Sequence, residues 1–248
     1  MLNGDVLLVG GGFGGQAVYV FERTGNQWVE QARLTGENAG ERDLFGYALA
    51  VDGETLAVAE MAYDPALERL ASSAVHLFQY TVSGWSLVST LTPGDGEEPV
   101  FIYSVALEGR TLVMGSMDAS GGFMAGAVYV YEKKMGGLGD WMLQTKLVPA
   151  DASFSSYTAF GSSVALLGDL LVVGAAGDSG QGFLSGAVYL FRKQGNTWVE
   201  AQKLWPDEVD YLGAFFGREV RLSANTLVVS APSEYGNAVY VYEILRDR

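Results

Sequence analysis

A five-residue segment that is apolar at every position except for His76 in one copy recurs along the chain. Its first copy is Ala17-Val18-Tyr19-Val20-Phe21, and the other four copies span residues 74–78, 127–131, 187–191 and 238–242. The β-branched and aromatic residues predict a β-strand. An antiparallel sheet usually keeps one face in water, whereas both alternating faces of this strand are apolar, so we expect both to be covered. The pattern therefore predicts sheets stacked face to face in a series, as the blades of a propeller are.

Three further strand types recur with this segment. A second apolar strand precedes each copy, at residues 6–10, 56–59, 112–115, 170–175 and 227–232. A fourth strand of mixed polarity, suited to the outer edge of a sheet, opens with Trp28, Trp85, Trp141 and Trp198. A first strand with small residues, suited to a crowded innermost position, opens with Phe45, Phe101, Phe160 and Phe216. We expect the four tryptophans, which share one repeat position, to lie in the core.

The tryptophans are 57, 56 and 57 residues apart, which is the spacing of a repeat array. The predicted fold is an all-β β-propeller of four-stranded antiparallel blades. It has about five blades, with the first lacking its inner strand and the last its outer strand. Residues 1–248 are interpreted as one domain with blades at about 1–36, 37–93, 94–149, 150–206 and 207–248.

The composition of the chain narrows the classes of partner and function that are expected. The chain has 248 residues, 33 glycines, no cysteine and a formal net charge of -14. The charge argues against nucleic acid as a partner, because phosphates require clusters of Lys and Arg. No apolar run approaches the roughly 20 residues needed to span a bilayer, and the first residues do not resemble a signal peptide. The absence of cysteine leaves the compartment open.

The Phe-Gly pairs of the first strand and the small residues after the second strand, such as Gly174-Ala175 and Ala231-Pro232, resemble the FG-GAP repeat. This repeat is known from the integrin α-chain propeller and from many bacterial surface proteins. The resemblance covers nearly the whole chain and implies a propeller that serves as an interaction module, with a cell-surface or extracellular location. Many integrin-type repeats bind calcium in an acidic loop between the first and second strands. The loops of this chain supply too few oxygen ligands, so no cofactor is expected.

The long loops point to one end of the blades as the binding face. In an up-and-down blade the loops after the second and fourth strands share one end, and here they are long, whereas the turns at the other end are short. Binding residues usually lie on long loops of a rigid scaffold. The candidate ligand-binding residues are the aromatics and acids of these loops, namely Phe13, Tyr63, Phe123, Phe183, Tyr235, Asp118 and Asp178. The aromatics have an alternative role as plugs of the core between blades, which is commoner for a residue at a fixed repeat position.

Acidic side chains share this end, namely Glu41, Asp43, Asp95, Glu97, Glu98, Asp207, Glu208 and Asp210. They are interpreted as a solvated rim, with cation or basic-partner binding as the alternative. The sole histidine, His76, replaces a strand tyrosine and is expected to be buried and hydrogen-bonded. No His and Cys set for a metal is present, and Gly10 to Gly15 matches a dinucleotide motif without its helix.

The sequence thus predicts a non-enzymatic module that binds a protein or a carbohydrate. A carboxylate- or cation-dependent glycoside or phosphoester hydrolase is the alternative. A third possibility is a structural fragment of a larger propeller. The incomplete terminal blades also suggest self-association, because unpaired strand edges invite pairing.

Overall fold

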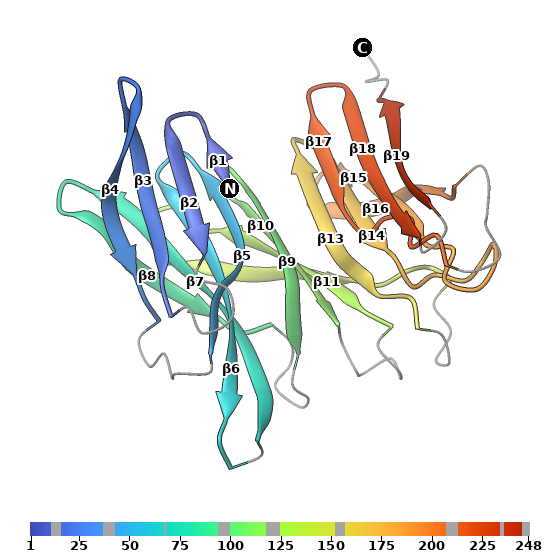
Figure 1. Ribbon diagram of the computed structural model, residues 1–248, viewed down its shortest axis with the longest axis horizontal. Coiled ribbons are helices and arrows are strands. Elements are labelled where there is room, and N and C mark those ends of the chain that lie inside the picture. Colours follow the sequence, from blue (N-terminus) through green and yellow to red (C-terminus); the bar gives the residue numbers. More distant parts are fainter. Residues whose placement is uncertain are drawn as a thin grey trace. The chain divides into compact units, whose positions relative to one another are not determined.

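The computed structural model describes residues 1–10, 16–36, 43–66, 68–93, 100–117, 125–151, 157–206, 213–233 and 236–244. Within these ranges every regular element is a β-strand, and there is no helix that could cross a membrane. The strands form five antiparallel sheets, which we call the first to fifth blades (Figure 1).

In each blade the strands are neighbours in the order in which they occur in the chain. The first blade comprises β1 (Leu2–Asn3), β2 (Val6–Gly10), β3 (Val18–Thr24) and β4 (Gln27–Leu34), and the second β5 (Leu44–Asp52), β6 (Thr55–Asp64), β7 (Arg69–Thr81) and β8 (Gly84–Leu91). The third comprises β9 (Phe101–Glu108), β10 (Thr111–Met117), β11 (Ala127–Lys133) and β12 (Trp141–Leu147). The fourth comprises β13 (Phe160–Leu167), β14 (Leu170–Ala175), β15 (Ala187–Gln194) and β16 (Thr197–Leu204), and the fifth β17 (Val220–Ser223), β18 (Thr226–Ser233) and β19 (Gly236–Glu243). The predicted all-β propeller class with about five blades is confirmed.

Compact packing divides the chain into two units, and the boundary passes through the third blade. One unit contains residues 1–112 and 131–143, and the other contains residues 113–130 and 144–248. Each unit has its own apolar core between two successive blades. In the first unit this core includes Leu8, Val18 and Val20 of the first blade with Phe45 and Phe78 of the second.

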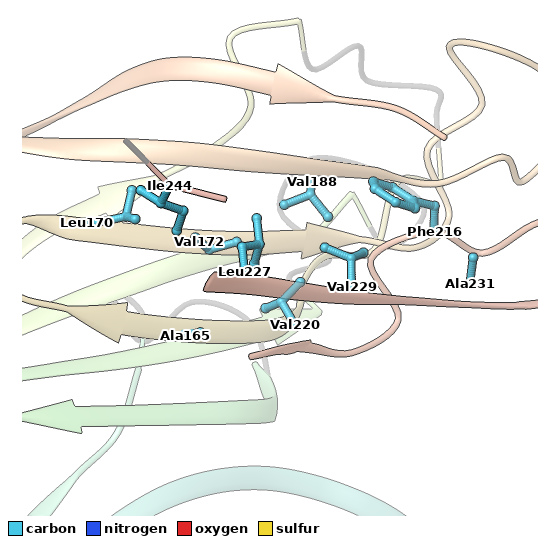
Figure 2. Packing of buried hydrophobic residues seen from close by; sticks show 10 residues of the cluster. All are labelled: Ala165, Leu170, Val172, Val188, Phe216, Val220, Leu227, Val229, Ala231 and Ile244. Atoms are coloured by element: carbon cyan, nitrogen blue, oxygen red, sulfur yellow. The ribbon is translucent and has the colours of Figure 1, made fainter. Parts of the chain in front are cut away.

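The core of the second unit lies between the fourth and fifth blades. Figure 2 shows Leu170, Val172 and Val188 of the fourth blade facing Leu227 and Val229 of the fifth. All five side chains are at most 3 % exposed. Burial of these apolar side chains removes their surface from water, which stabilises the packing of the two sheets.

The backbone conformation explains why glycine follows phenylalanine in the Phe-Gly pairs. Phe160 and Phe216 are fully buried, and the glycines that follow them, Gly161 and Gly217, have φ of 91° and 89°. A Cβ on Gly161 would also lie only 2.8 Å from the carbonyl oxygen of Ala127. Only glycine tolerates both the left-handed backbone and this close approach.

Two details of the strands correct the sequence-based expectations, and a third agrees with them. The first blade does have an inner strand, because β1 pairs with β2 over Leu2 and Asn3. The segment from Met61 to Ser73, expected to be a long loop, is a β-hairpin in which β6 and β7 continue their pairing as far as Asp64 and Arg69 (Figure 1). The closing blade has three strands within the described residues, as predicted.

Burial of the repeated elements is less uniform than expected. Val239 and Val241 of the fifth blade are 66 % and 67 % exposed, whereas the matching Val188 of the fourth blade is fully buried. Residues of the fifth blade cover Val188, whereas Val239 lies on the opposite face of the fifth blade, which is exposed within the described residues. The exposure of the tryptophans also differs between blades. Trp198 is 7 % exposed, whereas Trp28, in the first blade, is 40 % exposed. The prediction that all four lie in the core is therefore wrong, since Trp85 and Trp141 are only half-buried.

Candidate functional site

The loop between β14 and β15 in the fourth blade is organised around Asp178. The backbone carbonyl of this residue accepts hydrogen bonds from the Gly186 amide (2.8 Å) and the Ser185 hydroxyl (3.2 Å). Its carboxylate Oδ1 accepts a hydrogen bond from the Gly180 amide (2.9 Å). Asp178 is 4 % exposed, so its carboxylate is shielded from solvent inside the loop.

A lysine joins this buried carboxylate to a second one. Lys203 Nζ lies 2.8 Å from Asp178 Oδ2 and 2.6 Å from Asp151 Oδ2. Tyr189 Oη donates a hydrogen bond to Asp151 Oδ1 (2.9 Å) and lies 3.2 Å from Asp178 Oδ2. Cross-strand pairing of Tyr189 with Lys203 sets this arrangement, and the ammonium lies 4.7 Å from the centre of the tyrosine ring. We call Asp151, Asp178, Tyr189 and Lys203 the ion-pair cluster.

The carboxylates and the ammonium group of the ion-pair cluster stabilise one another in their charged forms. Burial alone would raise the pKa of Asp151, but hydrogen bonds from Lys203 and Tyr189 outweigh burial and lower it below its usual value. Burial would lower the pKa of Lys203, yet the two carboxylates raise it. Burial, together with the nearby Asp178 and Asp151, raises the pKa of Tyr189 far above that of a free tyrosine. The lysine is therefore charged and the tyrosine neutral across the physiological range.

Three exposed aromatic rings lie at the long-loop end of the fourth blade, the end that also carries the ion-pair cluster. Phe183 is 68 % exposed, Tyr157 44 % and Trp205 37 %. The Trp205 ring centre lies 5.3 Å from Lys203 Nζ. Tyr157 lies against Gly177 so closely that its ring occupies the place of a Cβ there. The buried ion pair thus fixes a loop whose outer surface carries aromatic side chains.

The structure brings two of the predicted site residues together. Asp178 and Phe183 share the loop between β14 and β15, the first buried inside it and the second exposed on it. Because Phe183 is exposed, it does not plug the core, which was the alternative role for the loop aromatics. Tyr63 lies in β6 of the other unit, half-buried, with its amide donating to Asp43 Oδ1 (2.7 Å).

The remaining candidates, Phe13, Phe123, Tyr235 and Asp118, fall outside the described residues. So do all the acids of the predicted rim except Asp43. Asp43 is 6 % exposed, and its interaction with Tyr63 ties it to the blade. For this residue the prediction of a solvated rim is wrong, because a backbone amide takes the place of water.

Sequence reasoning missed Lys203, Asp151, Trp205 and Tyr157. A signal for the lysine exists: a cation stands five residues after the repeat tryptophan in three copies, as Arg33, Lys146 and Lys203. Each cation lies over the tyrosine of the neighbouring strand, at 6.0 Å, 5.4 Å and 4.7 Å from the ring centre. The second copy replaces the pair with Thr90 and His76.

His76 is buried and hydrogen-bonded, as predicted. Its Nε2 lies 2.6 Å from Glu60 Oε2 and its Nδ1 lies 3.1 Å from Thr90 Oγ1. Its side chain is 7 % exposed. With both ring nitrogens engaged inside the second blade, His76 serves to satisfy polar groups in the core.

The acidic side chains of the ion-pair cluster already have partners within the fourth blade. Both oxygens of Asp178 and both of Asp151 accept hydrogen bonds or pair with Lys203. Across the described residues no three His, Cys, Asp or Glu side chains are grouped so that they could hold a metal ion. The exposed rings, in contrast, present apolar faces beside polar groups.

Comparisons with known proteins agree with this architecture. Residues 28–78, 85–131 and 141–191, more than half of the chain, match the FG-GAP repeat. Among solved structures, a prolyl endopeptidase studied for the role of inter-domain dynamics in catalysis and specificity is similar, with a TM-score of 0.52 at 18 % identity. The match covers 97 % of this chain but 33 % of that one, so the chain spans about a third of the enzyme's length. No curated protein gives a significant match. The three repeat matches show that the chain belongs to the FG-GAP repeat family.

Proposed function

We propose that this chain is a non-enzymatic binding module whose fourth blade holds a carbohydrate on the exposed rings of Tyr157, Phe183 and Trp205. The observation that supports it is the placement of these rings around a loop fixed by the buried ion-pair cluster. A loop held rigid before binding loses little conformational entropy when a ligand arrives. Aromatic faces beside polar groups suit sugars, which have apolar faces and hydroxyl edges.

A protein ligand on the same surface is the alternative within this proposal, since exposed aromatic side chains are also typical of protein interfaces. The hydrolase alternative is less well supported, because every carboxylate oxygen in the ion-pair cluster is already occupied. An extracellular location is a further part of the proposal and rests on the resemblance to bacterial surface proteins. Independence from cofactors is also proposed and rests on the shortage of oxygen ligands in the loops between the first and second strands.

The test is a binding assay against a panel of polysaccharides with the variants Trp205→Ala and Phe183→Ala. Each should weaken binding about tenfold, which corresponds to about 1.4 kcal/mol, and Phe183→Ala should leave the melting temperature unchanged because its ring is 68 % exposed. Tyr47→Ala is the matched control, since Tyr47 is 47 % exposed in the second blade. Binding by no polysaccharide, or equal loss in the control, would contradict the proposal.

We also propose that copies of the chain associate through the uncovered face of the fifth blade. Val239 and Val241 occupy the strand positions through which the fourth blade packs against the fifth, yet both are exposed. The first blade offers a counterpart, because Val9 and Trp28 are 44 % and 40 % exposed. The repeat itself shows that these two types of face fit one another.

A further inference from the structure

A cavity of about 130 Å³ lies between the first and second blades. It is at the end with the short turns, since Gly53 and Glu54 form the turn between β5 and β6, and Tyr80 and Trp85 flank the turn between β7 and β8. The lining residues are Val6, Val20, Phe21, Glu22, Gln31, Gly53, Glu54, Tyr80 and Trp85. Its size is close to that of an engineered cavity of about 150 Å³ that accommodates benzene.

The matching junction between the fourth and fifth blades explains why the cavity exists. Val6 and Val20 of the first blade correspond to Leu170 and Leu190 of the fourth, as shown by the equivalent register of β2 with β3 and of β14 with β15. Each valine is one methylene smaller than the leucine. Both leucines pack in the core of the second unit. At these two positions the first blade therefore lacks two methylene groups, whereas its Leu8 carries one more than the matching Val172.

Tyr80 contributes to the same difference. It matches Ile244 in the repeat, and the two backbone amides make the same hydrogen bond, Tyr80 to the Glu54 carbonyl (2.8 Å) and Ile244 to the Asn225 carbonyl (2.7 Å). Ile244 is 8 % exposed and lies beside Leu170 in Figure 2. Tyr80 is 46 % exposed instead, so it forms a wall of the cavity and does not fill it.

The walls and the rim favour a cation with an apolar surface. The rings of Tyr80 and Trp85 meet at 5.3 Å and 57°, and both border the cavity. The carboxylates of Glu22 and Glu54 are exposed at its rim, and neither pairs with a cation within the described part of the chain. The next residue, Arg23, pairs with Asp5 at 2.7 Å. In the fourth blade the position of Glu22 is taken by Arg192, so the junction between the fourth and fifth blades lacks this acidic rim.

We propose that this cavity binds the trimethylammonium group of a small quaternary ammonium compound such as choline. Aromatic faces attract such cations through the ring quadrupole, and desolvated contacts of this kind are the stronger ones. The methyl groups fit the apolar floor formed by Val6 and Val20. The carboxylates of Glu22 and Glu54 supply the opposite charge. The site is independent of the carbohydrate surface on the fourth blade, and each can fail without the other.

The first experiment separates charge from shape. Choline and its neutral isostere 3,3-dimethylbutan-1-ol are titrated into the whole chain, with the Trp85 indole signal followed by NMR and affinity measured by calorimetry. Choline should shift the Trp85 signal, and the isostere should bind at least tenfold more weakly. The double variant Glu22→Gln/Glu54→Gln should lose about tenfold in choline affinity. Glu243→Gln, which changes the same repeat position on the exposed edge of the fifth blade, should bind as the unmodified chain does.

The second experiment fills the cavity. The variant Val6→Leu/Val20→Leu copies the fourth blade, and we expect it to lose choline binding by tenfold or more while its melting temperature rises. Equal affinity for choline and the isostere, an unmoved Trp85 signal, or undiminished binding by the filled variant would overturn the proposal. If the two leucines destabilise the fold, the glutamine variants decide, because they alter only exposed side chains.

Discussion

At the scale of single residues, Lys203 has the clearest energetic role. It neutralises Asp178, whose side chain is 6 % exposed, and Asp151, whose side chain is 58 % exposed. Removing one partner of a buried ion pair leaves an uncompensated charge and costs about 3 kcal/mol or more. We therefore expect Lys203→Met to lower the free energy of unfolding by about 3 kcal/mol at neutral pH. Urea denaturation measures the loss.

The same variant tests the pH dependence of the ion-pair cluster. The folded chain lowers the pKa of Asp151, so its stabilisation is present above the unfolded value of 3.8 and is lost as the pH falls below it. The folded chain raises the pKa of Lys203, so that stabilisation is present below the unfolded value of 10.5 and is lost above it. The cost of Lys203→Met should be constant between these limits and shrink outside them. Arg33→Met, at the same repeat position over the ring of Tyr19, is the control, and an equal, pH-independent cost in both variants would refute the assignment.

At the scale of elements, the position of a blade in the chain decides how much each repeated residue contributes. Trp198 is nearly buried in the fourth blade and Trp28 is 40 % exposed in the first, although the sequence gives them one role. Trp198→Ala should cost about 3–5 kcal/mol, whereas Trp28→Ala should cost at most about 2 kcal/mol. Chemical denaturation of the two variants makes the comparison. Equal shifts of the midpoint would show that the blades cover both residues alike.

At the scale of the whole chain, sequence periodicity predicted the strands, their order and the number of blades, because the period of each element depends on its own residues. It missed the two-residue β1, which is too short to show a pattern, and the exposure of Val239, which depends on packing between sheets and not on the residues of the strand. It placed Asp178 and Phe183 in one loop, as the structure does. It did not identify Asp151 or Lys203, because the first approaches Asp178 only through tertiary packing and the second through the register of β15 and β16.

The uncovered terminal faces give the prediction that belongs to the whole molecule. Val239 and Val241 leave an apolar face on the fifth blade at the positions that pack against the next blade elsewhere in the repeat. Sedimentation velocity should show association that increases with concentration, and Val239→Glu/Val241→Glu should abolish it because charges cannot be buried without partners. Val82→Glu, which adds the same charge at a fully exposed turn residue, should leave association intact. A monomer at every concentration would mean that the exposed valines do not serve as an interface, and equal loss of association in the Val82 variant would mean that added negative charge alone prevents it.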